Sequence, residues 1–334
     1  MPAGAPGCLY GLAIGDALGM PTQLLPRGEI VARYGVLVDR FHPGPADHPV
    51  AAGSAAGSVT DDTEQAVLLA ELLLESGGRV DPRELGRRLV AWEESMRARG
   101  SLDLLGPSTR RAVAALARGV DPAVAGRDGT TNGAAMRIAP VGIAVAGERL
   151  VDRVVETSSA THGTGVALAG AAAVAAAVSA GVDGATVAQT FPIAVEAARR
   201  AASRGRWVAA ADVGARIRWA TELVAGLDPA DAAETIHTLV GTSLAAQESV
   251  PAAFAVLAVA GEDPWLACRL GASVGGDCDT IAAMAGAVAG ACHGVDAFPV
   301  EARQTVATVN GLDLDDLAAG LWDLRCANSR PPGA

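Results

Sequence analysis

The stretch "GGDCDTIAAMAGAVAGACHG" (residues 275–294) has two features that decide how this chain folds. Gly286, Gly290 and Gly294 recur every four residues, a spacing that places them along one face of a helix. Since glycine has no side chain, this face predicts that the helix backbone packs tightly in the core. Two aspartates, Asp277 and Asp279, stand at the head of this helix. Tight packing of the helix would hold both carboxylates in fixed positions.

Helical patterns dominate the rest of the chain, and only "GVLVDRF" (35–41) has the alternation of a strand. Helices are expected at about 165–180, 186–203, 209–225, 229–240, 250–260, 263–273, 280–293 and 299–309, and over "DLDDLAAGLWDLRCANS". No proline- or serine-rich linker and no internal repeat divides the sequence. The sequence therefore predicts one all-α domain over residues 1–334, with flexible tails at about 1–5 and 327–334. The segment 40–58 is long for a loop, and loops of this length are often functional.

Composition excludes several classes of partner. The chain of 334 residues carries a formal net charge of -11, and no run of Lys and Arg exceeds two residues. Nucleic-acid binding needs a basic surface, so we expect no such partner. The apolar segment "GVALAGAAAVAAAVSAG" is short and rich in alanine for a membrane span, and we expect a buried helix instead.

Cysteine usage indicates a reducing compartment. The five cysteines form no CxxC pair, and their number is odd. The N-terminal residues also lack the basic region of a signal peptide, and Asp16 interrupts their apolar run. These features predict reduced thiols and a cytoplasmic location.

A second acidic pair, Asp61 and Asp62 in "SVTDDTEQ" (58–65), precedes an amphipathic helical pattern. Asp61 and Glu64 have the spacing of a capping box, and Asp279 could cap its own helix in the same way. Capping does not explain why there are two aspartates at each helix start. One carboxylate is enough to accept the unpaired backbone N–H groups, and a second carboxylate adds electrostatic repulsion. Paired carboxylates with flanking threonine hydroxyls suit Mg²⁺ or Mn²⁺ rather than zinc. Two such pairs could hold two ions roughly 3.5–4 Å apart, although spacing alone does not bring the pairs together in space.

Five motifs in a fixed order carry a resemblance to a known family. They are "GLAIGDALGMP" (11–21), "TDDTEQ" (60–65), "TTNGAAMRIAP" (130–140), "THGTGVALAGAA" (161–172) and "GGDCDTIAAMAGAVAGACHG" (275–294). Over residues 5 to about 325 the chain resembles the ADP-ribosylglycohydrolase family. The resemblance implies a single compact, orthogonal all-helical domain with a binuclear Mg²⁺ or Mn²⁺ centre.

The resemblance also implies roles for individual residues. The metal ligands would be Thr60, Asp61, Asp62, Asp277, Asp279 and Thr280. The substrate-binding residues would be Thr131, Asn132, Gly133 and His162. Without the resemblance, an Asn-Gly pair is typical of an ordinary turn, and a lone histidine is typical of a hydrogen-bonded structural group.

Three further residues of these motifs have structural interpretations. Arg137 is expected to anchor the 130–140 segment by a salt bridge. Asp16 either supports the site from behind the ligands or caps the first helix. Cys278 is expected to point away from hard metal ions.

Position 23 departs from the family pattern. In many relatives a glutamate follows "GDALG" by four residues and activates the attacking water, whereas this chain has Gln23. Glutamine cannot take a proton, so Asp61 or Asp62 would assist the water, or the metal would acidify it sufficiently. A third alternative is a different substrate, and our hypothesis is that Gln23 favours a smaller ribosyl compound over an ADP-ribosylated protein.

The predicted activity is metal-dependent hydrolysis of the glycosidic bond at the anomeric carbon of an ADP-ribosyl or related ribosyl substrate. The alternatives are hydrolysis of a free nucleoside or ribosyl metabolite, and an ADP-ribose-binding homologue without chemistry. "DDTE" (61–64) matches the metal box of all-α isoprenoid synthases, but 3% aromatic residues and an acidic balance disfavour that class. "GTGVALAG" (163–170) has Leu168 where a dinucleotide-binding motif needs glycine.

Overall fold

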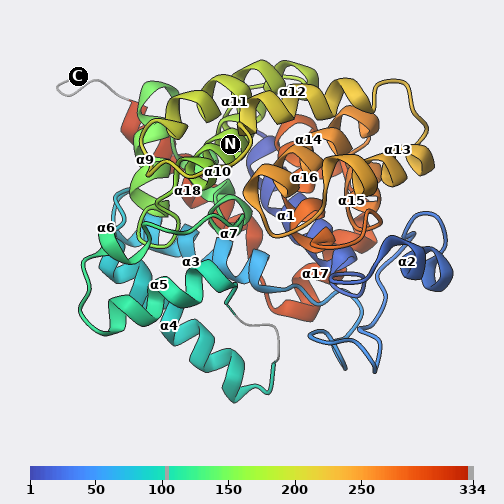
Figure 1. The fold of residues 1–334 in the computed structure, drawn as a ribbon, viewed down its shortest axis with the longest axis horizontal. Coiled ribbons are helices and arrows are strands. Elements are labelled where there is room, and N and C mark those ends of the chain that lie inside the picture. Colours follow the sequence, from blue (N-terminus) through green and yellow to red (C-terminus); the bar gives the residue numbers. More distant parts are fainter. Residues whose placement is uncertain (102–104, 330–334) are drawn as a thin grey trace.

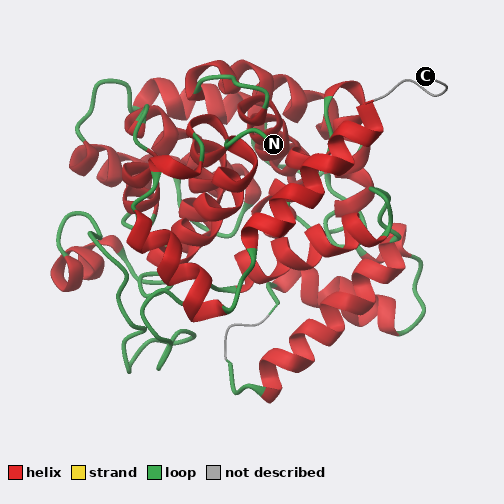
Figure 2. Ribbon diagram, turned by 180° about the vertical axis from the view of Figure 1, so that it is seen from behind, coloured by secondary structure: helices red, strands yellow, loops and turns green. Residues whose placement is uncertain are grey.

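The computed structural model describes residues 1–101 and 105–329, and helices account for nearly all of its regular structure (Figures 1 and 2). The first half contains α1 (Gly4–Gly19), α2 (Arg27–Tyr34), α3 (Asp61–Glu75), α4 (Pro82–Ala98), α5 (Pro107–Ala117), α6 (Pro122–Ala125), α7 (Gly133–Met136), α8 (Ala139–Ala144), η1 (Gly147–Arg149) and α9 (Leu150–Ser158). The second half contains α10 (Gly165–Val182), α11 (Val187–Ala202), α12 (Val213–Leu223), α13 (Pro229–Thr235), η2 (Ile236–Val240), α14 (Ala246–Ala260), α15 (Pro264–Gly271), α16 (Cys278–His293), η3 (Val295–Ala297), α17 (Val300–Asn310) and α18 (Leu314–Ser329).

Helices α1 and α16 form the central pair, although they come from opposite ends of the sequence (Figure 1). Their backbones touch through glycines. A β-carbon at Gly11 would collide with the carbonyl oxygen of Gly286, and one at Gly286 would collide with that of Gly11. Gly7 and Gly290 oppose each other in the same way. The glycine face predicted for α16 is therefore real, and its partner is a second glycine series on α1 that the sequence reading did not identify.

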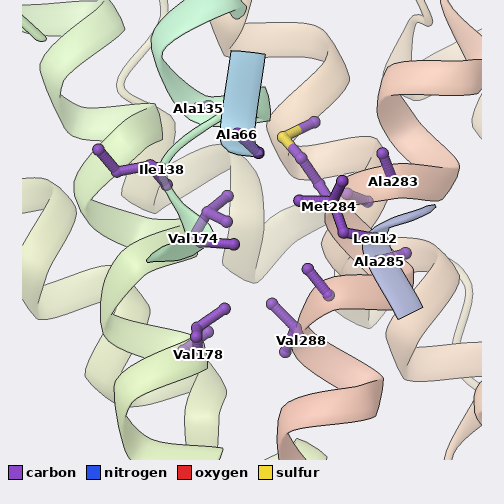
Figure 3. Packing of buried hydrophobic residues seen from close by; sticks show 14 of the residues in the cluster. Leu12, Ala66, Ala135, Ile138, Val174, Val178, Ala283, Met284, Ala285 and Val288 are labelled. Atoms are coloured by element: carbon purple, nitrogen blue, oxygen red, sulfur yellow. The ribbon is translucent and has the colours of Figure 1, made fainter. Parts of the chain in front are cut away.

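Helix α10 completes the core. In Figure 3, Val174 and Val178 of α10 lie across from Met284 and Val288 of α16. The helix has 18 residues and is long and apolar enough to cross a membrane, so the expectation that this segment is too short was wrong on length. However, 94% of it is buried inside the fold, as expected for a core helix.

The structure corrects three expectations about the fold. Residues 35–41 form no strand, and the described residues contain only two isolated β-bridges. Helix α1 begins at Gly4 and Ala5 is fully buried, so these residues belong to the helix rather than to a flexible tail. At the other end α18 continues to Ser329, whereas residues 330–334 lie outside the described residues. The expected long loop is present, since residues 35–60 contain no helix or strand.

Candidate metal and substrate site

The first turns of α3 and α16 meet, so the fold joins the two acidic pairs that sequence spacing could not place together. The hydroxyl of Thr280 in α16 donates a hydrogen bond to Oδ2 of Asp62 in α3, over 3.1 Å. Both residues are buried. The tight α1–α16 packing holds the α16 end of this contact, because α16 cannot shift without separating two backbones that touch.

Neither aspartate of the first pair caps its helix. The cap of α3 is Thr60, whose Oγ1 accepts a hydrogen bond from the backbone N–H of Asp62 over 3.3 Å. The carboxylate of Asp16 accepts the backbone N–H of Thr60 at 3.0 Å and that of Thr63 at 3.1 Å. It also accepts both threonine hydroxyls, at 2.7 and 2.5 Å. Asp16 thus serves the start of α3 from behind the pair, rather than capping the first helix.

The expected capping box was wrong for a simple reason. Glu64 does not reach back to the start of α3, because its Oε2 accepts a hydrogen bond from Trp92 Nε1 over 2.6 Å. The second acidic pair gives the same result. Asp277 is the residue before α16, but its side chain makes no capping hydrogen bond. Asp279 lies inside the first turn of α16 and so is not the capping residue. Both doublings therefore need an explanation other than capping.

A pocket of about 220 Å³ opens between these helix starts. Its acidic wall consists of Asp61, Asp277, Asp279 and Thr280. Its other walls include Gln23, Thr131, Asn132 and Gly133. Asp62, Thr60 and His162 are buried and do not line the pocket. Of the predicted residues, eight thus line one pocket and three lie behind its surface.

The carboxylates in the acidic wall and behind it are electrostatically unbalanced. Burial raises the pKa of Asp62 well above its usual value, and the nearby carboxylates of Asp61, Asp16 and Asp277 raise it further. Burial likewise raises the pKa of Asp277 to about 6, although the Asn132 hydrogen bond opposes the shift. Oδ1 of Asp62 is buried and has no hydrogen-bond partner among the described residues. Such a carboxylate is stabilised by a cation.

The donor set fits a hard divalent cation, because it consists of carboxylate and hydroxyl oxygens. Thr60 donates its proton to Asp16, which leaves oxygen lone pairs for other partners. Within residues 1–101 and 105–329, no three His, Cys, Asp or Glu side chains converge as a ready-made metal site. The threonine hydroxyls and water would therefore have to complete the coordination.

A family model described as ADP-ribosylglycohydrolase matches residues 5–331. The chain belongs to the ADP-ribosylglycohydrolase family. It is therefore a glycohydrolase of this all-α, metal-dependent family, as the sequence motifs predict.

The relatives range from whole-length matches to partial ones. The chain is 37% identical to the uncharacterized protein YegU of Escherichia coli K12, over 96% of each chain. It is 39% identical to the ADP-ribosylhydrolase ARH3 of Danio rerio over 103 residues, which are 28% of this chain and 27% of that protein. A solved structure titled "ADP-ribosylglycohydrolase-related protein complex" superposes with a TM-score of 0.73 at 27% identity, covering 96% of this chain and 98% of that one.

Within this ADP-ribosylglycohydrolase, Asp61 is held by two residues behind it. Gln65 donates from Nε2 to Oδ2 of Asp61 over 2.8 Å, and Arg137 donates from Nη1 to Oε1 of Gln65 over 3.1 Å. Arg137 is buried, and its Nη2 also donates to Thr161 Oγ1 over 2.6 Å. It forms no salt bridge with any described residue, so the expected salt bridge was wrong and hydrogen bonds anchor it instead. Burial lowers the pKa of Arg137 to about 10, which keeps it charged at neutral pH.

The segment 130–133 is fastened on three sides. Asn132 donates from its backbone to Leu244 O over 2.9 Å. Its Nδ2 donates to Ser249 Oγ at 2.9 Å and to Asp277 Oδ2 at 2.5 Å. Asn132 therefore lines the pocket and also fixes one of its carboxylates, so it is more than a turn residue.

His162 occupies a different place from the one expected. It is fully buried, with Nε2 3.0 Å from Thr131 Oγ1 and Nδ1 2.8 Å from Thr161 Oγ1. Burial and the charge of Arg137 lower its pKa well below the usual value. His162 therefore lies behind the pocket lining, with both ring nitrogens close to threonine hydroxyls, and its role in substrate binding stays a prediction. The family motif identified His162 but could not show whether it lines the pocket or lies behind the lining residues.

Sequence reasoning also missed part of the pocket wall. The additional lining residues are Leu24, Val50, Leu105, Gly106, Pro107, Thr109, Arg110, Met136 and Leu244. Pro107 at the first turn of α5 was a readable signal of a helix start, but nothing in the sequence shows which way that helix points. Cys278 agrees with expectation, because its Sγ lies 3.2 Å from Thr22 Oγ1 and it does not line the pocket.

Proposed function

We propose that this chain hydrolyses the glycosidic bond at the anomeric carbon of an ADP-ribosyl substrate, using two Mg²⁺ or Mn²⁺ ions. One observation carries the proposal above all others. Both acidic doublings meet at a single pocket, and no aspartate of either pair provides the side-chain cap of its helix. Carboxylates gathered at such electrostatic cost are typical of a catalytic site.

The proposed ligands of the ions divide between the two helices. Thr60, Asp61 and Asp62 would contribute from the start of α3, and Asp277, Asp279 and Thr280 would contribute from the start of α16. When bound, the cations would offset part of the negative charge of these carboxylates and lower the pKa of water.

The side chains of the chain itself have separable roles in this proposal. Asp61 lines the pocket and is oriented by Gln65, so it is the carboxylate placed to accept a proton from the attacking water. Asp62 lies behind the pocket surface and acts as a ligand only. The water oxygen bonds to the anomeric carbon, and the departing group leaves with the electron pair of the broken bond and takes up a proton. The acidic wall stabilises the positive charge that develops on the ribose ring.

The size of the pocket restricts which part of a substrate it encloses. Pockets that enclose drug-sized ligands commonly measure about 300–1,000 Å³, and this one measures about 220 Å³. We propose that it takes the ribosyl end, while the rest of an ADP-ribosyl group lies outside. The same observation supports a second candidate, hydrolysis of a smaller ribosyl compound.

A turnover assay tests the proposal. Purified protein would be incubated with ADP-ribosylated peptides, and separately with free nucleosides, in EDTA and after addition of Mg²⁺ or Mn²⁺. We expect release of ADP-ribose that disappears in EDTA and returns with one of the two cations. Metal-dependent release of ribose from nucleosides without release of ADP-ribose would favour the second candidate. Turnover that is unaffected by EDTA would contradict the metal assignment.

A further inference from the structure

The side-chain amide of Gln23 is a buried hydrogen-bond donor without an acceptor. Gln23 lines the pocket, yet only 6% of the residue is exposed. Its Nε2 is buried and has no hydrogen-bond partner among the described residues. A buried donor that is left unpaired is rare in native proteins and is satisfied when a ligand supplies an acceptor. The Gln23 amide is therefore a candidate donor to an acceptor that enters the pocket.

The turn that carries Gln23 is fixed to the acidic wall. Leu24 N donates to Gly276 O over 2.7 Å, and Gly276 N donates to Leu25 O over 3.0 Å. Gly276 directly precedes Asp277 in the chain. Leu24 itself has a φ of 61°, in the left-handed region that residues with side chains seldom adopt. A strained residue persists only where its surroundings enforce it, and such residues cluster at functional sites.

His48 holds the same turn from the long loop. Its Nδ1 accepts the backbone N–H of Ala51 over 2.9 Å and that of Val50 over 3.2 Å. The ring proton therefore lies on Nε2, which donates to the backbone carbonyl of Gln23 over 2.8 Å. Val50 lines the pocket as well, so His48 joins two parts of its wall. The loop of residues 35–60 thus contacts the Gln23 turn through the His48 side chain.

We propose that Gln23 determines substrate specificity by donating its amide N–H to an acceptor oxygen of the leaving group. This inference rests on the proposed function. Leu24, next in the chain, lines the pocket and is 48% exposed, so the turn forms part of the pocket edge, and the proposal places the leaving group at this edge. The favoured leaving group is neutral or anionic and bonded to the ribose through oxygen, such as a phosphate. A guanidinium presents only donors, so it cannot accept a hydrogen bond from the unpaired Nε2 of Gln23.

A comparison of leaving groups tests this assignment. The substrates would be ADP-ribose joined at the anomeric carbon to phosphate, to an alkyl hydroxyl and to a guanidinium nitrogen. We expect the unmodified enzyme to favour the phosphate over the guanidinium substrate by about tenfold or more in kcat/KM. Gln23→Glu should reverse the ratio, because a carboxylate repels phosphate and pairs with guanidinium. The ratio cancels any general loss caused by the substitution.

Variants of His48 separate positioning from folding. His48→Gln keeps a donor near the Nε2 position and should preserve the phosphate preference. His48→Asn keeps an acceptor for the Val50 and Ala51 N–H groups but loses the bond to Gln23, and should weaken the preference several-fold at an unchanged melting temperature. If the enzyme cleaves these substrates and Gln23→Glu leaves the ratio unchanged, the specificity assignment is overturned alone. If no variant cleaves any of them, the proposed function fails and the assignment fails with it.

Discussion

The two acidic helix starts reach the same pocket by different means. At α3 the support is polar and redundant, because Asp16 receives four hydrogen-bonded groups and Gln65 fixes Asp61. At α16 the support is the fit of two backbones along the α1 glycines, plus one amide from Asn132. A network of hydrogen bonds loses strength one contact at a time, whereas close backbone packing fails as a whole. The two halves of the site should therefore respond differently to single substitutions.

The largest expected effect comes from substitutions that test whether catalysis needs the carboxylates of both α3 and α16. Asp62→Asn and Asp279→Asn each remove one charge with little change of shape. We expect either substitution to lower kcat/KM by about 10³-fold or more, the cost of losing one strong electrostatic partner of a transition state. ADP-ribose release would measure the activity, and circular dichroism should show unchanged helix content. Activity that survives in one variant would restrict the metal site to the other helix.

The next largest effect is expected from a substitution that disrupts the packing of α16 against α1. Gly286→Val would force the α1 and α16 backbones apart, and we expect a loss of about 3 kcal/mol or more in unfolding free energy. Gly28→Ala is the matched control, because Gly28 lies in α2 with no atom near its missing side chain. That control should be neutral or slightly stabilising. Urea unfolding of both variants checks the difference, and equal stabilities would show that backbone contact does not fix α16.

The polar supports can be compared with a matched pair of substitutions. Asn132→Ala removes the side-chain amide that is hydrogen-bonded to the Asp277 carboxylate, and we expect divalent-cation affinity to fall about 10- to 100-fold. Thr63→Val removes one of four groups bonded to Asp16 and should cost less than about fivefold, because the backbone bonds remain. Calorimetric titration with Mn²⁺ measures both. A larger loss in Thr63→Val would contradict the redundancy inferred for α3.

The same contrast explains what the sequence could predict. Local periodicity and terminal residues were sufficient for most of the longer helices but not for α2, α7 or α8, and the ordered motifs were sufficient for the family. The sequence did not predict whether a side chain lines the pocket or is buried behind it. For Asp62 and His162 this depends on contacts with residues far away in the chain. The capping-box prediction failed for this reason, since Glu64 is taken by Trp92 from α4. The role of the long loop also depended on a contact that no motif encodes, the bond from His48 to Gln23.

The smallest predicted effect is a pH dependence that bound metal should reverse. Asp277 has a pKa of about 6 in the folded protein, against 3.8 for an ordinary aspartate, so the folded state binds more protons between these values. In EDTA, its contribution to stability should be fully present below about pH 4 and should be lost as the pH rises through about 6. Between pH 5 and pH 7 we expect the free energy of unfolding to fall by on the order of 1 kcal/mol because of this carboxyl.

Asp277→Asn should remove this part of the fall, whereas Asp296→Asn, at an exposed position, should keep it. Urea unfolding in EDTA at both pH values measures the effect, and added Mg²⁺ should restore stability at pH 7. If stability instead rises from pH 5 to pH 7 in EDTA by the same amount in all three proteins, burial of the Asp277 carboxylate carries no electrostatic cost, and the case for a cation at α16 loses its physical basis.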